Sequence, residues 1–134
     1  MGNISELIFK VLIVGCGSFL GGILRYLVSL VSQNLCKSFP WGTLIVNLLG
    51  CFLIGCLTGL FTRSSQSQYL NLFLIVGFCG GFTTFSTFSK ECFNMFQAGD
   101  FLHLIIYLLI CLLVGVFLVF LGLKISGGCS NMGI

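Results

Sequence analysis

One stretch of the sequence, residues 77–89, combines glycine, hydroxyl and phenyl residues and reads GFCGGFTTFSTFS. Each glycine weakens a helix by about 1 kcal/mol, and threonine and serine can bond the backbone groups that a broken helix frees. Bare carbonyls can coordinate a cation, and the N-terminus of a half-helix can face an anion. Phe85 and Phe88 would add ring edges, which carry partial positive charge. The stretch therefore predicts a broken helix with an ion site, and a purely structural kink is the alternative.

Polar side chains also interrupt the other apolar stretches of the chain. Arg25 is predicted either to be a buried anchor with a polar partner or to extend to the lipid headgroups. Asn47, with Thr43 one helical turn before it, predicts either an interhelical hydrogen bond or a donor that lines a pore. Tyr107 and Cys111 form a similar stripe farther along the chain. An amide or hydroxyl inside the membrane needs a polar partner, which is either another protein group or the contents of a pore. These residues are therefore candidates for an ion path.

The composition around these residues is that of an integral membrane protein. Of the 134 residues, 57% are hydrophobic and 7% are charged, whereas a soluble domain has about 25% charged residues. The mean hydropathy is +1.16. So few charges could not cover a soluble surface, and the length leaves no room for a soluble catalytic domain. We therefore expect neither an enzyme nor a partner of nucleic acid.

Gaps between charged residues predict where the chain crosses the membrane. Each gap accommodates a helix of about 20 residues, and the continuous apolar runs exclude the alternating pattern of a membrane β-barrel. We expect an all-α membrane protein with one transmembrane domain, residues 1–134, and a third helix that is broken near its middle. The four predicted helices are residues 6–32, 40–62, 69–97 and 101–123.

Small residues, cysteines and basic residues give weaker indications. Gly17 and Gly21 are four residues apart, a spacing that lets helix backbones approach closely in lipid. The eight cysteines include no C-x-x-C pair, so they are expected to be small buried hydrophobic residues rather than metal ligands. The basic residues only weakly favour one orientation in the membrane. Four helices enclose little volume, which favours an oligomer.

Three segments in order along the chain resemble one family of membrane proteins. They are GCGSFLGGILRY at 15–26, PWGTLIVNLLGCFLIG at 40–55, and residues 77–88 followed by SKE. The chain resembles the small bacterial fluoride channels of the Fluc/CrcB type over nearly its whole length. The resemblance implies an antiparallel, dual-topology homodimer in the cytoplasmic (inner) membrane. It also implies passive export of fluoride, which lowers cytoplasmic fluoride and gives fluoride resistance.

The resemblance also implies roles for individual residues. Residues implied for the fluoride pathway are Asn47, Phe85, Phe88, Thr43, Ser86, Thr87, Tyr107 and Arg25. The backbone carbonyls of Gly80 and Thr83 from both subunits would hold a structural Na⁺ at the dimer interface. The family often has serine where this chain has Cys111, and a thiol is a weaker hydrogen-bond donor than a hydroxyl.

A small dual-topology, proton-coupled exporter of toxic cations is the alternative function of similar size. Such a transporter needs a carboxylate within its first helix to exchange a cation for a proton. Glu6 lies at the very start of that helix, and the charge farther along it is Arg25. A non-transporting membrane subunit is a third possibility, but it leaves the cluster at 77–89 unexplained. The sequence therefore favours the fluoride channel.

Overall fold

A computed structural model describes residues 3–32, 39–63 and 67–127, and these residues are helical apart from short connections. The elements are α1 (Ile4–Ser32), α2 (Trp41–Arg63), α3 (Gln68–Asn71), the π-helix η1 (Leu72–Cys79), α4 (Gly80–Phe82), α5 (Phe85–Gln97), α6 (Phe101–Leu109), the π-helix η2 (Ile110–Val114) and α7 (Gly115–Ile125).

These elements form four apolar spans that are long enough to cross a membrane. The spans are Ile4–Ser32, Trp41–Thr62, Gln68–Gln97 and Phe101–Ile125. The prediction of four helices is confirmed, and their ends differ from the expected ones by at most two residues. The two π-helices were not predicted.

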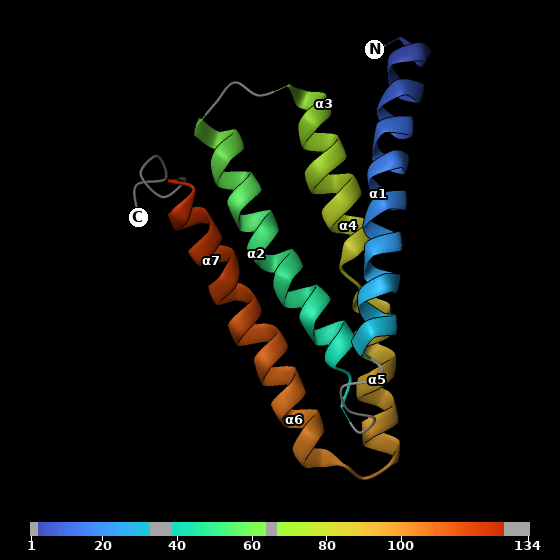
Figure 1. The fold of residues 1–134 in the computed structure, drawn as a ribbon, viewed down its shortest axis with the longest axis vertical. Coiled ribbons are helices and arrows are strands. Elements are labelled where there is room, and N and C mark those ends of the chain that lie inside the picture. Colours follow the sequence, from blue (N-terminus) through green and yellow to red (C-terminus); the bar gives the residue numbers. More distant parts are fainter. Residues whose placement is uncertain (1–2, 33–38, 64–66, 128–134) are drawn as a thin grey trace.

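The spans pack as two pairs of neighbouring helices (Figure 1). α7 runs along α2, and α1 runs along η1 and α4. The start of α1 and the end of α7 lie toward the same end of the molecule, and the turn between α5 and α6 lies at the opposite end. Gly99 in that turn has φ 71°, a conformation that favours glycine. Asp100 then caps α6 by accepting a hydrogen bond from His103 N at 3.4 Å.

Glycines bring the paired backbones into contact. A Cβ atom at Gly21 would collide with the carbonyl of Phe78, and one at Gly81 would lie 2.5 Å from the carbonyl of Ser18. Both glycines belong to the contact between α1 and the first half of the third span. The prediction that the Gly17/Gly21 spacing serves close packing is confirmed, because Gly17 is equally confined.

The third span is interrupted at two residues near its middle. Thr83 has ψ 158° and Thr84 has ψ 114°, so both are extended, and helix resumes at Phe85. The break therefore lies within the predicted stretch. The predicted cause was wrong, because Gly77 and Gly81 remain helical and serve as contacts with α1. The chain leaves the helix only after the glycines, where hydroxyl side chains supply alternative hydrogen bonds.

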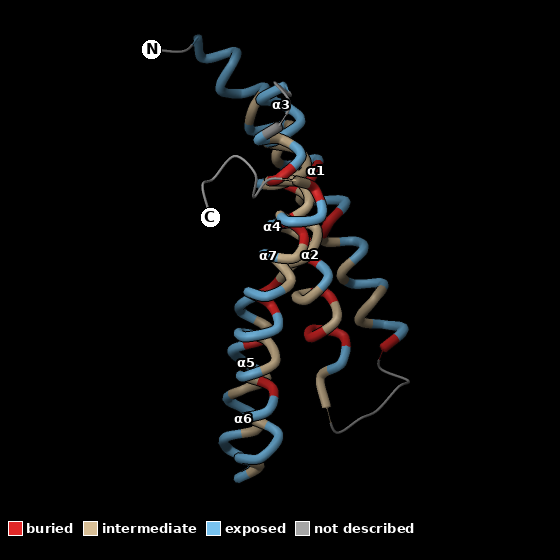
Figure 2. Tube along the Cα trace, turned by 90° about the vertical axis from the view of Figure 1, so that its left-hand side faces the viewer, coloured by how far each residue is buried: buried red, intermediate tan, exposed pale blue. Residues whose placement is uncertain are grey.

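Buried positions follow the contact lines between the helices, and the outward surfaces are exposed (Figure 2). A small core cluster consists of Leu44, Phe88 and Tyr107. Only 11% of the most apolar window is buried in the first and in the fourth span. Apolar side chains on the outward faces therefore require lipid or another protein surface to cover them.

Candidate functional site

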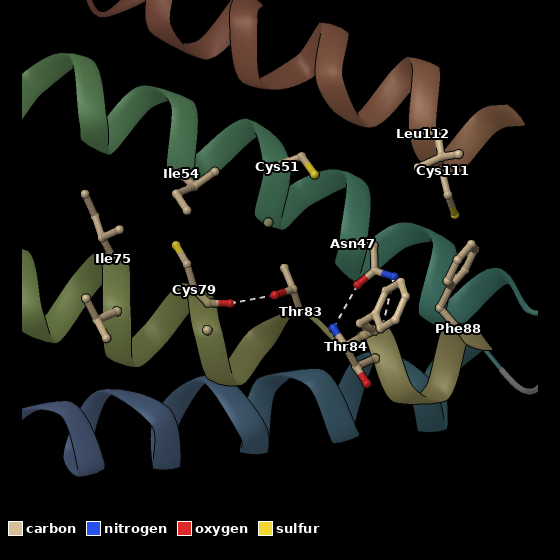
Figure 3. A pocket seen from close by; sticks show the side chains of 14 residues that line it. Asn47, Cys51, Ile54, Ile75, Cys79, Thr83, Thr84, Phe88, Cys111 and Leu112 are labelled. Carbon is tan, nitrogen blue, oxygen red and sulfur yellow. Dashed lines mark hydrogen bonds between the residues drawn. The ribbon is translucent and has the colours of Figure 1, made fainter. Parts of the chain in front are cut away.

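A cavity of about 560 Å³ borders the break in the third span. Its walls come from α2, η1, α4, α5 and η2, together with the two extended threonines (Figure 3). The cavity brings together six residues that the sequence singles out. They are Asn47, Gly80, Thr83, Phe85, Phe88 and Cys111.

Asn47 of α2 holds the break through two hydrogen bonds to one residue. Thr84 N donates to Asn47 Oδ1 at 2.9 Å, and Asn47 Nδ2 donates to Thr84 O at 3.2 Å. The side-chain amide thus satisfies both backbone groups of an extended residue that has no strand beside it. Of the two expectations for Asn47, the interhelical hydrogen bond is observed directly. Its Nδ2 carries a second hydrogen.

Hydroxyl groups complete the hydrogen bonding around the break. Thr83 N and Thr83 Oγ1 both donate to the carbonyl of Cys79, each at 3.0 Å. Thr84 Oγ1 accepts from Thr87 N at 3.3 Å, which caps α5, and donates to Thr87 Oγ1 at 3.0 Å. Ser86 Oγ lies 3.4 Å from Thr84 Oγ1, and Ser86 is exposed. Ser86 and Thr87 therefore join the site through Thr84 rather than as part of the cavity wall.

Phe85 and Phe88 begin the second half of the third span and differ sharply in exposure. The side chain of Phe85 is 80% exposed, whereas Phe88 is 8% exposed and packs with Tyr107 at a ring-centroid distance of 5.0 Å. The centroids of Phe85 and Phe88 are 6.0 Å apart. One ring is thus held firmly by its neighbours, and the other lies open beside the cavity.

Glu91 of α5 connects three helices, and sequence reasoning did not identify it as a site residue. Its carboxylate accepts a hydrogen bond from Thr43 Oγ1 of α2 and another from Tyr107 Oη of α6, both at 2.8 Å. Thr43 and Tyr107 are buried. The available signal was an acidic residue inside the predicted third helix, together with two hydroxyls that needed acceptors. Thr43 and Tyr107 do not line the cavity, and both are engaged by Glu91.

Arg25 lies apart from this arrangement. It is half-buried on α1, and its Nε is buried without a hydrogen-bond partner among the described residues. It is absent from the wall of the cavity beside the break. A polar partner, the first of the two expectations for Arg25, is therefore not found for Nε in the described part of the chain.

Gly80 and Thr83 offer backbone oxygens at the end of a helix. The last carbonyls of a helix have no partner within that helix, and Gly80 has open space on its side-chain side. Carbonyl oxygens are hard ligands that suit cations such as Na⁺ rather than soft metals. Among the described residues, no group of three or more His, Cys, Asp or Glu side chains could hold a metal ion. The oxygen donors at the break therefore fit a hard cation.

Comparisons with known proteins match most of the chain to one family. A family model described as "CrcB-like protein, Camphor Resistance (CrcB)" matches residues 12–123. A protein of Azobacteroides pseudotrichonymphae genomovar. CFP2 is 45% identical over 115 residues, which cover 84% of this chain and 92% of the relative. One from Thermus thermophilus is 44% identical over 119 residues, covering 88% of this chain and 95% of the relative. One from Elusimicrobium minutum is 46% identical over 119 residues, covering 84% and 92%. Each of the three is named fluoride-specific ion channel FluC.

Proposed function

The chain belongs to the CrcB family, and on this premise we propose that it is a fluoride-specific ion channel of the cell membrane. The channel lets fluoride leave the cytoplasm down its gradient and is not an enzyme. The observation that carries the proposal is the cavity at the break, where an amide, hydroxyls and phenyl rings meet and none of the described residues in the wall is basic. The cation-exporter alternative finds no support, because Glu6 is at the start of α1 and pairs with Lys10 at 2.7 Å.

Neutral donors suit the passage of a small, strongly hydrated anion. A pore must replace the water around the ion and still release it. The second hydrogen of Asn47 Nδ2 and the ring edges of Phe85 and Phe88 supply weak, fixed positive potential. A lysine or arginine in the same wall would bind fluoride more strongly and slow its exit. We place the hydroxyls of Ser86 and Thr87 along the approaches and Arg25 near a vestibule, whereas the buried hydroxyls of Thr43 and Tyr107 act behind the path, where they donate to Glu91.

A second copy in antiparallel orientation completes the proposed channel. The cavity is open on one side, Phe85 beside it is 80% exposed, and Gly80 is exposed as well. A partner whose own broken helix faces this surface would enclose the path with the same residue types. The carbonyls of Gly80 and Thr83 from both subunits would hold a structural Na⁺ between the two breaks. When bound, that ion would tie the two interrupted helices together.

Fluoride release from liposomes tests this function. Liposomes that contain the purified protein are loaded with fluoride or with chloride. Once compensating charge can cross the membrane, they are expected to release fluoride and to retain chloride. Equal chloride release, or no release of fluoride, would contradict the proposal.

The same assay tests the assignment of Asn47. Asn47→Asp keeps an acceptor for Thr84 N but removes the amide donor, so fluoride release should slow by at least about tenfold, which corresponds to a barrier increase of about 1.4 kcal/mol. Asn71→Asp is the matched control, because Asn71 is an exposed residue at the end of α3. Full flux in Asn47→Asp would remove Asn47 from the path.

A further inference from the structure

Cysteine side chains from three helical elements gather around the cavity. Cys51 of α2, Cys79 of η1 and Cys111 of η2 all line it. Cys92 of α5 lies close by, because Cys92 and Cys111 both pack against the core cluster that contains Phe88 and Tyr107. All four are free thiols. The proposed fluoride path of this chain therefore carries nucleophilic sulfur, which the proposed function does not use.

Two of the cavity thiols are accessible enough to react. Cys79 is 2% exposed and is therefore shielded. Cys51 and Cys111 are half-buried. A Cβ at Gly115 would lie 3.4 Å from Cys51 Sγ, so this thiol reaches the junction of η2 and α7, one turn beyond Cys111. In Figure 3 the side chain of Cys111 points toward the ring of Phe88.

The chemistry of these groups selects soft, thiol-seeking cations. Thiolate sulfur prefers soft metals, whereas hard cations prefer oxygen. An organomercurial cation needs only one thiol, so the reaction is compatible with the absence of a three-ligand cluster among the described residues. The S–H bond of the cysteine breaks, an S–Hg bond forms, the proton goes to solvent, and no atom changes its oxidation state. The cavity of about 560 Å³ has room for the added group, since a water molecule occupies about 30 Å³.

We propose that Cys51 and Cys111 form a block site for soft metal cations inside the fluoride path. An adduct on either sulfur occupies the cavity beside Asn47 and Phe88 and obstructs the ion. The inference rests on the proposed channel function. Thiol-seeking metals should therefore block fluoride export by this chain. Competing thiols should reverse that block.

The test compares fluoride release from liposomes before and after exposure to methylmercury. Release by the untreated wild type first establishes the channel function, so its failure at this stage would be a failure of the function alone. Treatment is expected to slow release by at least about tenfold, equivalent to about 1.4 kcal/mol of barrier, and excess dithiothreitol is expected to restore it. The treated rate is divided by the untreated rate for each variant, so a changed basal rate does not affect the comparison.

Variants then locate the block. Cys51→Ser/Cys111→Ser should lose the sensitivity, whereas Cys16→Ser should keep it, because Cys16 is exposed on α1 outside this cavity. Cys36 and Cys129 lie outside the described residues, so peptide mass spectrometry assigns each adduct to its position. The proposal is overturned if the wild type carries adducts on Cys51 and Cys111 and still releases fluoride at full rate. Equal block in the double variant would overturn it as well.

Discussion

The two halves of the third span are held in place by different physical means. The first half, η1 and α4, packs against α1 through glycine backbones, with Gly21 against the carbonyl of Phe78 as one example. The second half, α5, is held by hydrogen bonds between Glu91 and the hydroxyls of two other helices. A backbone contact excludes every added atom, whereas a hydrogen-bond network tolerates changes of shape but not the loss of a partner. The extended residues Thr83 and Thr84 lie between these two halves.

This difference explains how the break is fixed in position although η1 and α4 carry no hydroxyl, amide or charged side chain. Close glycine contacts fix η1 and α4 against α1, so the chain reaches Thr83 at a defined place. Asn47 then fixes the direction in which Thr84 leaves, and Glu91 fixes the rotation of α5. The exposed ring of Phe85 is therefore oriented by residues on both sides of the interruption.

The largest expected effect comes from one methyl group in the glycine contact. Gly21→Ala places a Cβ against the carbonyl of Phe78, and we expect it to lower the free energy of unfolding by about 1–3 kcal/mol, the usual cost of overpacking. Gly22→Ala is the control, because its Cβ meets nothing within 4 Å. Denaturant titration in detergent measures both. If both variants lose the same free energy of unfolding, the contact with η1 and α4 is not the reason why residue 21 must be glycine.

An intermediate effect is expected from the hydrogen-bond network. Tyr107→Phe keeps the ring against Phe88 but removes the donor to Glu91, which should lower the free energy of unfolding by about 1–2 kcal/mol. Tyr26→Phe, at a largely exposed tyrosine of α1, should have little effect. In a Glu91→Gln background the cost of Tyr107→Phe should fall. If the two substitutions change the free energy of unfolding by strictly additive amounts, Tyr107 and Glu91 are not coupled.

The smallest effect is expected at the turn between α5 and α6. Hydrogen bonds from the His103 side chain, at 2.8 Å, lower the pKa of Asp100 below its ordinary value of 3.8. A lowered pKa in the folded protein stabilises the fold above the ordinary value, and that stabilisation is lost as the pH falls through the folded-state pKa. Asp100→Asn should therefore lower the melting temperature slightly at neutral pH and make no difference in strong acid. If the difference in melting temperature between the wild type and Asp100→Asn grows toward acid pH, the pKa of Asp100 is not lowered in the folded protein.

The sequence predicts the spans well because charged residues are so rare in them. Gaps between charges locate all four helices, and the residues at 77–89 locate the break. The glycines in that stretch were misjudged, because composition alone does not distinguish a glycine that weakens a helix from one that admits a neighbouring backbone. Gly77 and Gly81 are of the second kind.

The sequence did not predict the hydrogen bonds of Asn47 and Glu91, because their partners are distant along the chain. Periodicity indicates that Asn47 needs a polar partner, but it does not indicate that this partner is the backbone of Thr84. In the sequence, Glu91 stands out only as the last residue of the SKE that follows residues 77–88. Its acceptor role depends on Thr43 and Tyr107, which reach it from two other helices. Hydrogen-bond geometry of this kind arises from tertiary packing and leaves little trace in the local pattern.

The two π-helices have a consequence for how this chain tolerates insertions and deletions. Both η1 and η2 contribute to the cavity wall, through residues such as Cys79 and Cys111. A π turn holds about one residue more than an α turn, so loss of one residue there would restore an ordinary α-helix and leave the residues on both sides facing as before. The same loss inside an α-helix would rotate every residue on the far side by about 100°. Deletion of a single codon in η1 or η2 should therefore be better tolerated than deletion of a single codon in the α-helix α2.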